Sequence, residues 1–272
     1  MAQLARNKAT ICIVNYKTHD FTRLCLRSIR KFTSCPYEVI VVDNSSNDES
    51  VEYLRSLKWI RLIERPRQSD QPQGSFDHAS ALDLGLVNCN TEFFVAMHSD
   101  TFVKKTDWLA KLISYFNEDE KIVCVGSGKI ELTPMWIELF KRVTDVKSFM
   151  RGFFSTPAQR AKYRYHNRTI CCLYRTEVLR REGLSFLMGQ DQGLTAGQKL
   201  YFELVDRGHK TVELPPSVMG QYITHLAHAT QVINPREFKL RDRTHRKFHR
   251  TMDRIMSSTT IQHILADDSL DR

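Results

Sequence analysis

The strongest constraint on the fold is the alternation of short apolar runs with amphipathic segments over the first 125 residues. Residues 9–15 (ATICIVN), 37–43 (YEVIVVD) and 92–97 (EFFVAM) are predicted to be strands, and segments of helical period separate them. The runs ICIV and VIVV are continuously apolar, which is typical of strands covered on both faces. The sequence therefore predicts an α/β fold with a Rossmann-like, mainly parallel sheet and helices on both faces.

The regular pattern ends near residue 128, but 272 residues suffice for one substantial core. We expect a single domain over residues 1–232, with halves at 1–128 and 129–232. Residues 135–168 are rich in aromatic and basic side chains. From residue 235 onward, basic side chains outnumber acidic ones, so residues 233–272 are predicted to form a basic C-terminal helical tail.

The formal net charge of +9 favours anionic partners such as phosphates or an acidic membrane face, although basic surfaces also serve solubility alone. Nucleic acid is not expected, because the chain carries none of the usual recognition motifs. The basic tail predicts peripheral contact with an anionic membrane. A solvated helix and an oligomer contact are the alternatives for this tail.

The compartment is indicated by the cysteines and by the lack of long apolar runs. Seven cysteines, an odd number without C-x-x-C spacing, suggest reduced, packed thiols. No stretch reaches the roughly 20 apolar residues of a membrane span, and the first ten residues lack the apolar core of a signal peptide. We expect a cytoplasmic protein, with peripheral association at the inner face of the membrane as the further expectation from its tail.

Polar residues stand at the ends of three predicted strands. Asn15, Asp43 and Asp100 close or directly follow these strands, and the carboxyl ends of parallel strands meet at one edge of a sheet. A carboxylate there can hold a divalent metal, which in turn can hold a diphosphate. The alternative is that these residues only cap the helices that follow them. Three such residues in successive βα units favour a ligand site.

Glycine-rich signatures narrow the choice of enzyme class. The chain contains neither G-x-G-x-x-G nor G-x-x-x-x-G-K-[ST], which disfavours a Rossmann dehydrogenase and a P-loop enzyme. Gly74 precedes a predicted helix, where the backbone can approach a phosphate. The first strand ends in NYKTHD without a glycine-rich loop, which disfavours a nucleotidyltransferase.

Three segments together resemble the family-2 glycosyltransferases of GT-A fold. They are ICIVNY (11–16), PYEVIVVDNSSNDESVEYL (36–54) and HSD (98–100), and the resemblance covers roughly residues 10–230. It implies an inverting transfer of a sugar from a nucleotide diphosphate sugar, commonly a UDP-sugar, to a hydroxyl group of a saccharide or glycolipid. It also implies Mn²⁺ or Mg²⁺ as cofactor, a nucleotide-sugar-binding half at 1–128 and an acceptor-side half at 129–232.

The resemblance assigns roles to individual residues. His98 stands where the family has the first acid of its D-x-D motif, and Asp100 keeps the last, which implies Asp100 as the main metal ligand. His225 matches a late histidine near the metal, with His228 as competitor. The donor-binding residues implied by the resemblance are Asn15, Tyr16, Asp43, Asn44, Gly74, His78 and Ser99.

One departure concerns the general base. The acidic pair that family members carry at the acceptor aligns with Ala196 and Gly197, neither of which can accept a proton. Asp191 is the nearest carboxylate and is the candidate catalytic base. The alternatives are another residue, an acceptor that needs little activation, or a non-catalytic protein that only binds nucleotide sugars.

Overall fold

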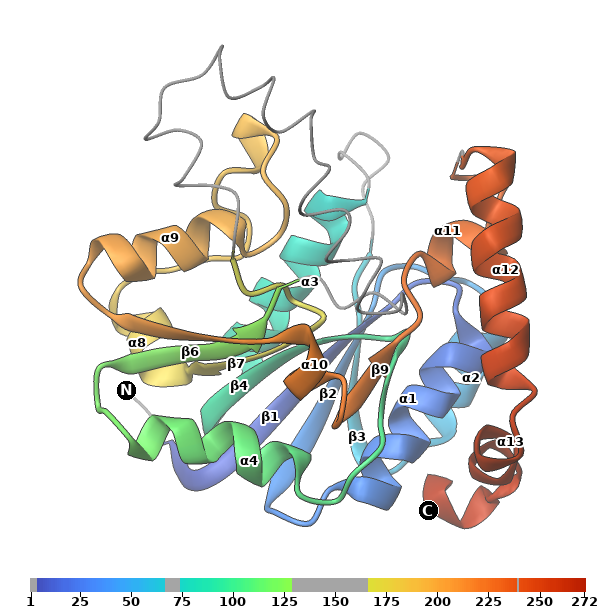
Figure 1. Cartoon of the computed structure of the whole chain (residues 1–272), viewed down its shortest axis with the longest axis horizontal. Coiled ribbons are helices and arrows are strands. Elements are labelled where there is room, and N and C mark those ends of the chain that lie inside the picture. The colour runs from blue at the N-terminus through green and yellow to red at the C-terminus, as the bar shows by residue number, and fades with distance from the viewer. Residues whose placement is uncertain (1–3, 67–73, 129–165, 239) are drawn as a thin grey trace.

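The computed structural model describes residues 4–66, 74–128, 166–238 and 240–272. These residues form a seven-stranded sheet with the order β3-β2-β1-β4-β7-β6-β8 (Figure 1). Only β7 runs antiparallel to its neighbours, so the prediction of a mainly parallel sheet is confirmed. The strands are β1 (Ala5–Asn15), β2 (Tyr37–Asp43), β3 (Ile60–Glu64), β4 (Thr91–His98), β6 (Ile122–Ser127), β7 (Cys171–Arg175) and β8 (Lys210–Leu214).

Helices cover both faces of this sheet, as predicted from the continuous apolar runs. On β1, Ile11 and Ile13 pack with residues of α1, α2 and α4, whereas Cys12 and Val14 pack with α3, α8 and α9. All four side chains are buried. The helices are α1 (His19–Phe32), α2 (Glu49–Ser56), α3 (Ser75–Asn88), α4 (Trp108–Ser114), α8 (Thr176–Arg181), α9 (Gln198–Asp206), α10 (Pro216–Met219), α11 (Ala229–Ile233), α12 (Asp242–Met256) and α13 (Thr259–Ala266).

Strand register brings the predicted strand ends to one edge. Asn15 pairs with Asp43 across β1 and β2, and Val14 pairs with His98 across β1 and β4. After β4 the chain turns at residues 99–100 and enters β5 (Thr101–Val103), which pairs antiparallel with β9 (Ile223–His225). In this pairing Thr101 lies opposite His225, so a late segment of the chain is held beside the end of β4.

The C-terminal part of the chain forms the helices α12 and α13, and it packs against α1 (Figure 1). Met252, Ile261 and Ile264 are buried with Leu24 of α1 in a third apolar cluster. The apolar side chains of the tail therefore face the protein. The basic residues of α12 are exposed: Arg243, Arg246, Lys247, Arg250 and Arg254.

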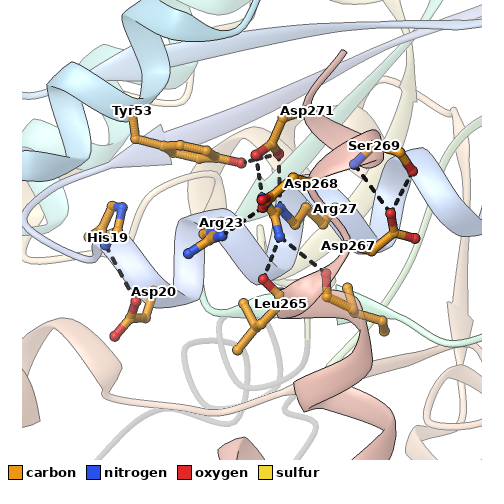
Figure 2. A network of polar contacts seen from close by, with 11 residues as sticks. His19, Asp20, Arg23, Arg27, Tyr53, Leu265, Asp267, Asp268, Ser269 and Asp271 are labelled. Atoms are coloured by element: carbon orange, nitrogen blue, oxygen red, sulfur yellow. Dashed lines mark hydrogen bonds and ion pairs between the residues drawn. The ribbon is translucent and has the colours of Figure 1, made fainter.

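A buried arginine fastens the tail to the domain (Figure 2). The Arg27 side chain is 1% exposed, donates to Asp271 at 2.9 Å and to Asp268 at 2.6 Å, and also donates to the carbonyl oxygen of Leu265. Tyr53 of α2 donates to the same Asp271 at 2.8 Å. The extreme C-terminus is thus tied to both α1 and α2.

Within the described ranges, no helix combines the length and apolarity needed to cross a membrane. The aromatic and basic stretch that was expected on the acceptor side falls mostly at residues 129–165, outside the described residues. Only its last part, residues 166–168, can be placed.

Candidate active site

A cavity of about 420 Å³ lies at the edge where β1, β2 and β4 end. Its described wall is assembled from segments far apart in the sequence. The lining residues are Val14, Tyr16, Asn44, Gly74, Ser75, Asp77, His78, His98, Asp100, His166, Arg168, Thr169, Ile170, Thr195, Ala196, His225, Ala227, His228, Ala229, Thr230, Gln231 and Phe238.

Two imidazoles and a carboxylate converge in this cavity. One ligand atom from each of His98, Asp100 and His225 lies within 4.8 Å of the others. Nε2 of His225 is 3.2 Å and Nδ1 of His98 is 3.8 Å from Oδ1 of Asp100. This buried oxygen accepts no hydrogen bond, while Oδ2 accepts one from the amide of Ala229 at 3.4 Å. The cluster contains His225 and not its competitor His228.

The electrostatics of the cluster favour a carboxylate beside neutral imidazole. Burial opposes ionisation of Asp100, but the facing His225, together with His98 and the amide of Ala229, lowers the Asp100 pKa below its ordinary value. Burial, together with nearby His78, lowers the pKa of His98 well below its ordinary value. A neutral imidazole has a lone pair free for a metal.

These residues fit a divalent transition metal ion. The buried Oδ1 of Asp100, without a hydrogen bond, has two imidazole nitrogens near it. Imidazole suits Zn²⁺, Fe²⁺ and similar ions, whereas Mg²⁺ prefers oxygen ligands alone. Two imidazole nitrogens and one carboxylate oxygen can together hold a divalent metal ion.

Three of the predicted donor-binding residues lie in a buried polar network and are not among the described residues lining the cavity. Nδ2 of Asn15 donates to Oδ1 of Asp43 at 2.7 Å and to Ser50 at 2.8 Å, and Oδ2 of Asp43 accepts from the amide of Ser46 at 3.0 Å. The Ser99 hydroxyl lies 3.1 Å from that of Thr18. These bonds hold the ends of β1 and β2 and the turn after β4 in place.

The other four predicted donor-binding residues, Tyr16, Asn44, Gly74 and His78, line the cavity. The Tyr16 hydroxyl donates to Glu237, which fastens the segment after α11 over the end of β1. Gly74 precedes α3 with a φ of 73°, a left-handed value that glycine adopts without strain. Nε2 of His78 is 3.2 Å from the Thr169 hydroxyl.

Asp191 lies outside the cavity wall. It is exposed in a short 3-10 helix, Gln190–Gln192, and is not among the described lining residues. Its neighbour Gln190 donates to the hydroxyl of Ser75, which does line the cavity. Ala196, where the resemblance places the first acid of the missing pair, is also part of the wall. The cavity therefore lacks a carboxylate at this position.

His166, Arg168 and Thr169 are among the wall residues that were not predicted from the sequence. They directly precede β7, whose apolar run follows them without a break. Burial and the nearby Arg168 guanidinium lower the pKa of His166 to about 4, so its imidazole is neutral near pH 7. The sequence signal for this region was the aromatic and basic composition of residues 135–168, and it identified no particular side chain.

Comparisons with known proteins bear on the family and the fold of the chain. A curated relative, the teichoic acid poly(glycerol phosphate) polymerase of Staphylococcus epidermidis, is 24% identical over 156 residues, which is 53% of this chain and 21% of the relative. The chain thus spans about a fifth of the length of that relative.

Two solved structures share the fold at low sequence identity. A mannosyltransferase from Pyrobaculum calidifontis, in complex with GDP-Man and Mn²⁺, gives a TM-score of 0.52 at 17% identity over 76% of this chain and 54% of that chain. TarS 1–349 of S. aureus gives a TM-score of 0.51 at 12% identity over 89% of this chain and 69% of that chain. The expected GT-A fold is confirmed.

The profile of the family described as "Glycosyl transferase family 2" matches residues 10–183, more than half of the 272 residues. The match begins in β1 and ends after α8, so it contains the strand ends and the H-S-D segment. The chain therefore belongs to glycosyl transferase family 2.

Proposed function

We propose that this chain transfers a sugar from a nucleotide diphosphate sugar to a hydroxyl acceptor, with inversion at the anomeric carbon and divalent-metal assistance. One observation carries the proposal: His98, Asp100 and His225 converge in a cavity at the carboxyl edge of the sheet. In open α/β sheets, ligands bind at this edge. Membership of glycosyl transferase family 2 supports the reaction class.

Different residues along this edge would bind different parts of the donor. Tyr16 and Asn44 lie at the nucleotide end, and the glycine before α3 offers its backbone and the helix N-terminus to the diphosphate. Asp100 and His225, with His98 beside them, would hold the metal ion. When bound, this ion supplies positive charge to the departing diphosphate.

The proposed donor is a UDP-sugar, and the proposed metal ion is Mn²⁺, with Mg²⁺ as the alternative. The Mn²⁺ in the mannosyltransferase complex and the two imidazoles here support Mn²⁺. That complex holds GDP-Man, so GDP-sugars belong in the same screen. The proposed acceptor is a saccharide or glycolipid.

A binding screen tests the donor site directly. Thermal unfolding is measured with UDP, GDP, dTDP and their sugars, each with and without Mn²⁺. A ligand that binds only the native state raises the unfolding temperature by mass action. We expect metal-dependent stabilisation by one nucleotide class. If none of them stabilises the protein in the presence of Mn²⁺, the donor site is wrongly assigned.

Asp191 remains the proposed general base. Its position next to Gln190, which contacts the cavity wall, supports the role, whereas its exposure does not. Asp191→Asn tests whether Asp191 is the base. If Asp191 deprotonates the acceptor hydroxyl, its loss lowers kcat and removes the acidic limb of the pH profile of the reaction. If kcat and the pH profile stay at their wild-type values, the base lies elsewhere.

A second candidate function is nucleotide-sugar binding without transfer. Ala196 in the cavity wall and the adjacent Gly197 favour it, because neither can deprotonate an acceptor. Measured hydrolysis or transfer of a donor that the screen shows to bind would reject this alternative. Binding without any turnover would favour it.

Peripheral membrane contact is proposed for the exposed basic face of α12, with Arg243, Arg246 and Arg250 among its residues. The apolar side of this helix is occupied by α1, so attraction would be electrostatic. Co-sedimentation with vesicles containing anionic lipid tests it. Binding that persists after charge-reversal of these three arginines would contradict the assignment.

A further inference from the structure

Arg168 is a cationic side chain in the cavity wall that no described residue neutralises. Its guanidinium makes no hydrogen bond or ion pair within the described ranges, and Arg168 lines the same cavity as His98 and His166. An arginine in a half-enclosed site usually pairs with a carboxylate or phosphate. Because no described residue pairs with this guanidinium, a bound anion is a suitable partner for it.

The backbone around Arg168 is held in place on both sides. The Arg168 amide donates to the carbonyl oxygen of Ser127 at 2.9 Å, and Asn167 donates to the carbonyl oxygen of Val212 at 3.0 Å. Farther along, the carbonyl oxygen of Ile170 accepts from the amide of His98 at 3.1 Å. The segment that carries Arg168 is thus fixed to β6, β8 and the end of β4.

His166 supplies a second, independent indication of a ligand. Its side chain is 5% exposed, and Nδ1 has no hydrogen-bond partner among the described residues. Leaving a buried polar atom unpaired costs about 1–3 kcal/mol, so such atoms usually meet a ligand or water. The neutral imidazole has one N–H group to donate to an anion, two residues from Arg168.

Sheet order tells which part of a substrate these residues would meet. Along the sheet, β2 and β1 carry the proposed nucleotide end, β4 carries the metal cluster, and β7 comes next. Arg168 and His166 precede β7, so they lie beyond the cluster from Tyr16 and Asn44. A donor laid along this edge, with its diphosphate at β4, directs its sugar and the acceptor toward β7.

We propose that Arg168 and His166 form an anion subsite that binds a phosphate group carried by the acceptor. The inference rests on the proposed function and adds a substrate class to it: an acceptor with a phosphate monoester or phosphodiester near the reacting hydroxyl. The guanidinium binds two phosphate oxygens, and His166 donates to a third. The donor diphosphate is the other source of the same chemistry, and the experiment separates the two.

The experiment measures binding of methyl phosphate by calorimetry to the full chain, both alone and after saturation with Mn²⁺ and the nucleoside diphosphate that binds best. The variants are Arg168→Gln, Arg168→Lys and His166→Phe. Lys58→Gln is the matched control, because it removes one positive charge from an exposed residue outside the cavity. Unfolding temperatures verify that each variant is folded.

We expect methyl phosphate to bind the nucleotide-loaded wild type. Arg168→Gln weakens this binding about 10- to 100-fold, as loss of hydrogen bonds to a charged group does. Arg168→Lys retains part of the affinity for methyl phosphate, and His166→Phe lowers this affinity less than Arg168→Gln does. Lys58→Gln leaves it unchanged. The affinity for the nucleoside diphosphate stays unchanged in all four variants.

Several results would overturn the inference. The proposed subsite is wrong if methyl phosphate does not bind the wild type, or if it binds the wild type and Arg168→Gln equally well. Competition between methyl phosphate and the nucleotide, with both weakened by Arg168→Gln, assigns Arg168 to the donor diphosphate instead. If no nucleotide binds, the proposed function fails by itself, and the titration without nucleotide still tests Arg168.

Discussion

Nε2 of His225 lies 3.2 Å from Oδ1 of Asp100, although β9 and the turn after β4 are far apart in the sequence. The pairing of Thr101 with His225 in the β5–β9 sheet produces this proximity. His225 belongs to that pair, and Asp100 directly precedes Thr101. The amide of Leu226 also donates to the carbonyl oxygen of Asp100 at 3.0 Å. The spacing of the two side chains is therefore set by backbone hydrogen bonds.

Asp100→Asn is expected to abolish Mn²⁺ binding at the cluster, because an amide lacks the charge that holds a divalent ion. Transfer should fall at least about 100-fold, as expected when metal stabilisation of the leaving group is lost. The measurements are Mn²⁺ calorimetry and transfer rate. Asp107→Asn, at an exposed residue outside the cavity, is the control. A variant that binds Mn²⁺ as tightly as wild type would refute the metal assignment.

His98→Asp is expected to shift the metal preference of the cluster from Mn²⁺ toward Mg²⁺. The substitution replaces an imidazole nitrogen with a carboxylate oxygen, and Mg²⁺ prefers oxygen ligands. Calorimetry with each ion gives the ratio of the two dissociation constants, which should move by about tenfold, or about 1.4 kcal/mol. An unchanged ratio would mean that His98 does not contact the ion.

Acidification is expected to destabilise the protein through His166. Burial and Arg168 lower its folded-state pKa to about 4, below the ordinary value of about 6.5. The unfolded chain therefore takes up the proton first, and the stability contributed by His166 is present above pH 6.5 and lost as the pH falls toward 4. The loss is of the order of 2–3 kcal/mol.

Chemical denaturation at a series of pH values checks this expectation. His166→Gln, which cannot titrate, should show a shallower fall in the free energy of unfolding between pH 6.5 and 4. His263→Gln, at an exposed histidine of α13, should follow the wild-type curve. Identical slopes for wild type and His166→Gln would show that His166 titrates normally.

Arg27→Met is expected to destabilise the attachment of the C-terminal helices. It leaves the carbonyl oxygen of Leu265 and two carboxylates without their shared donor (Figure 2). Breaking a fully buried pair costs about 3–5 kcal/mol, but Asp268 is 78% exposed, so we expect about 2–3 kcal/mol.

Denaturation and limited proteolysis measure the effect on the tail. Cleavage in the segment between α11 and α13 should become faster in Arg27→Met. Arg23→Met serves as control, because Arg23 pairs with the same exposed Asp268 at 3.2 Å and such surface pairs contribute about 0–1 kcal/mol. Equal proteolysis of the two variants would show that the apolar cluster alone holds the tail.

The fold was predictable because its signals are local. Continuous apolar runs mark strands buried on both faces, and β2 occurs at the predicted residues. The ends of β1, β2 and β4 follow from the same pattern, so the edge that carries the site could be located. The packing of the tail against α1 could not, because it depends on Arg27 meeting carboxylates near the C-terminus.

For the candidate site, the sequence alone identified Asp100 and the residues at the strand ends, since their position along a strand determines the edge at which they lie. Only the tertiary structure distinguished His225 from His228, assigned Asn15 and Asp43 to a buried network, and brought His166 and Arg168 into the wall. Local patterns specify which face or edge a residue occupies. The partner of a side chain from a distant segment depends on strand register and helix packing, which are properties of the whole folded chain.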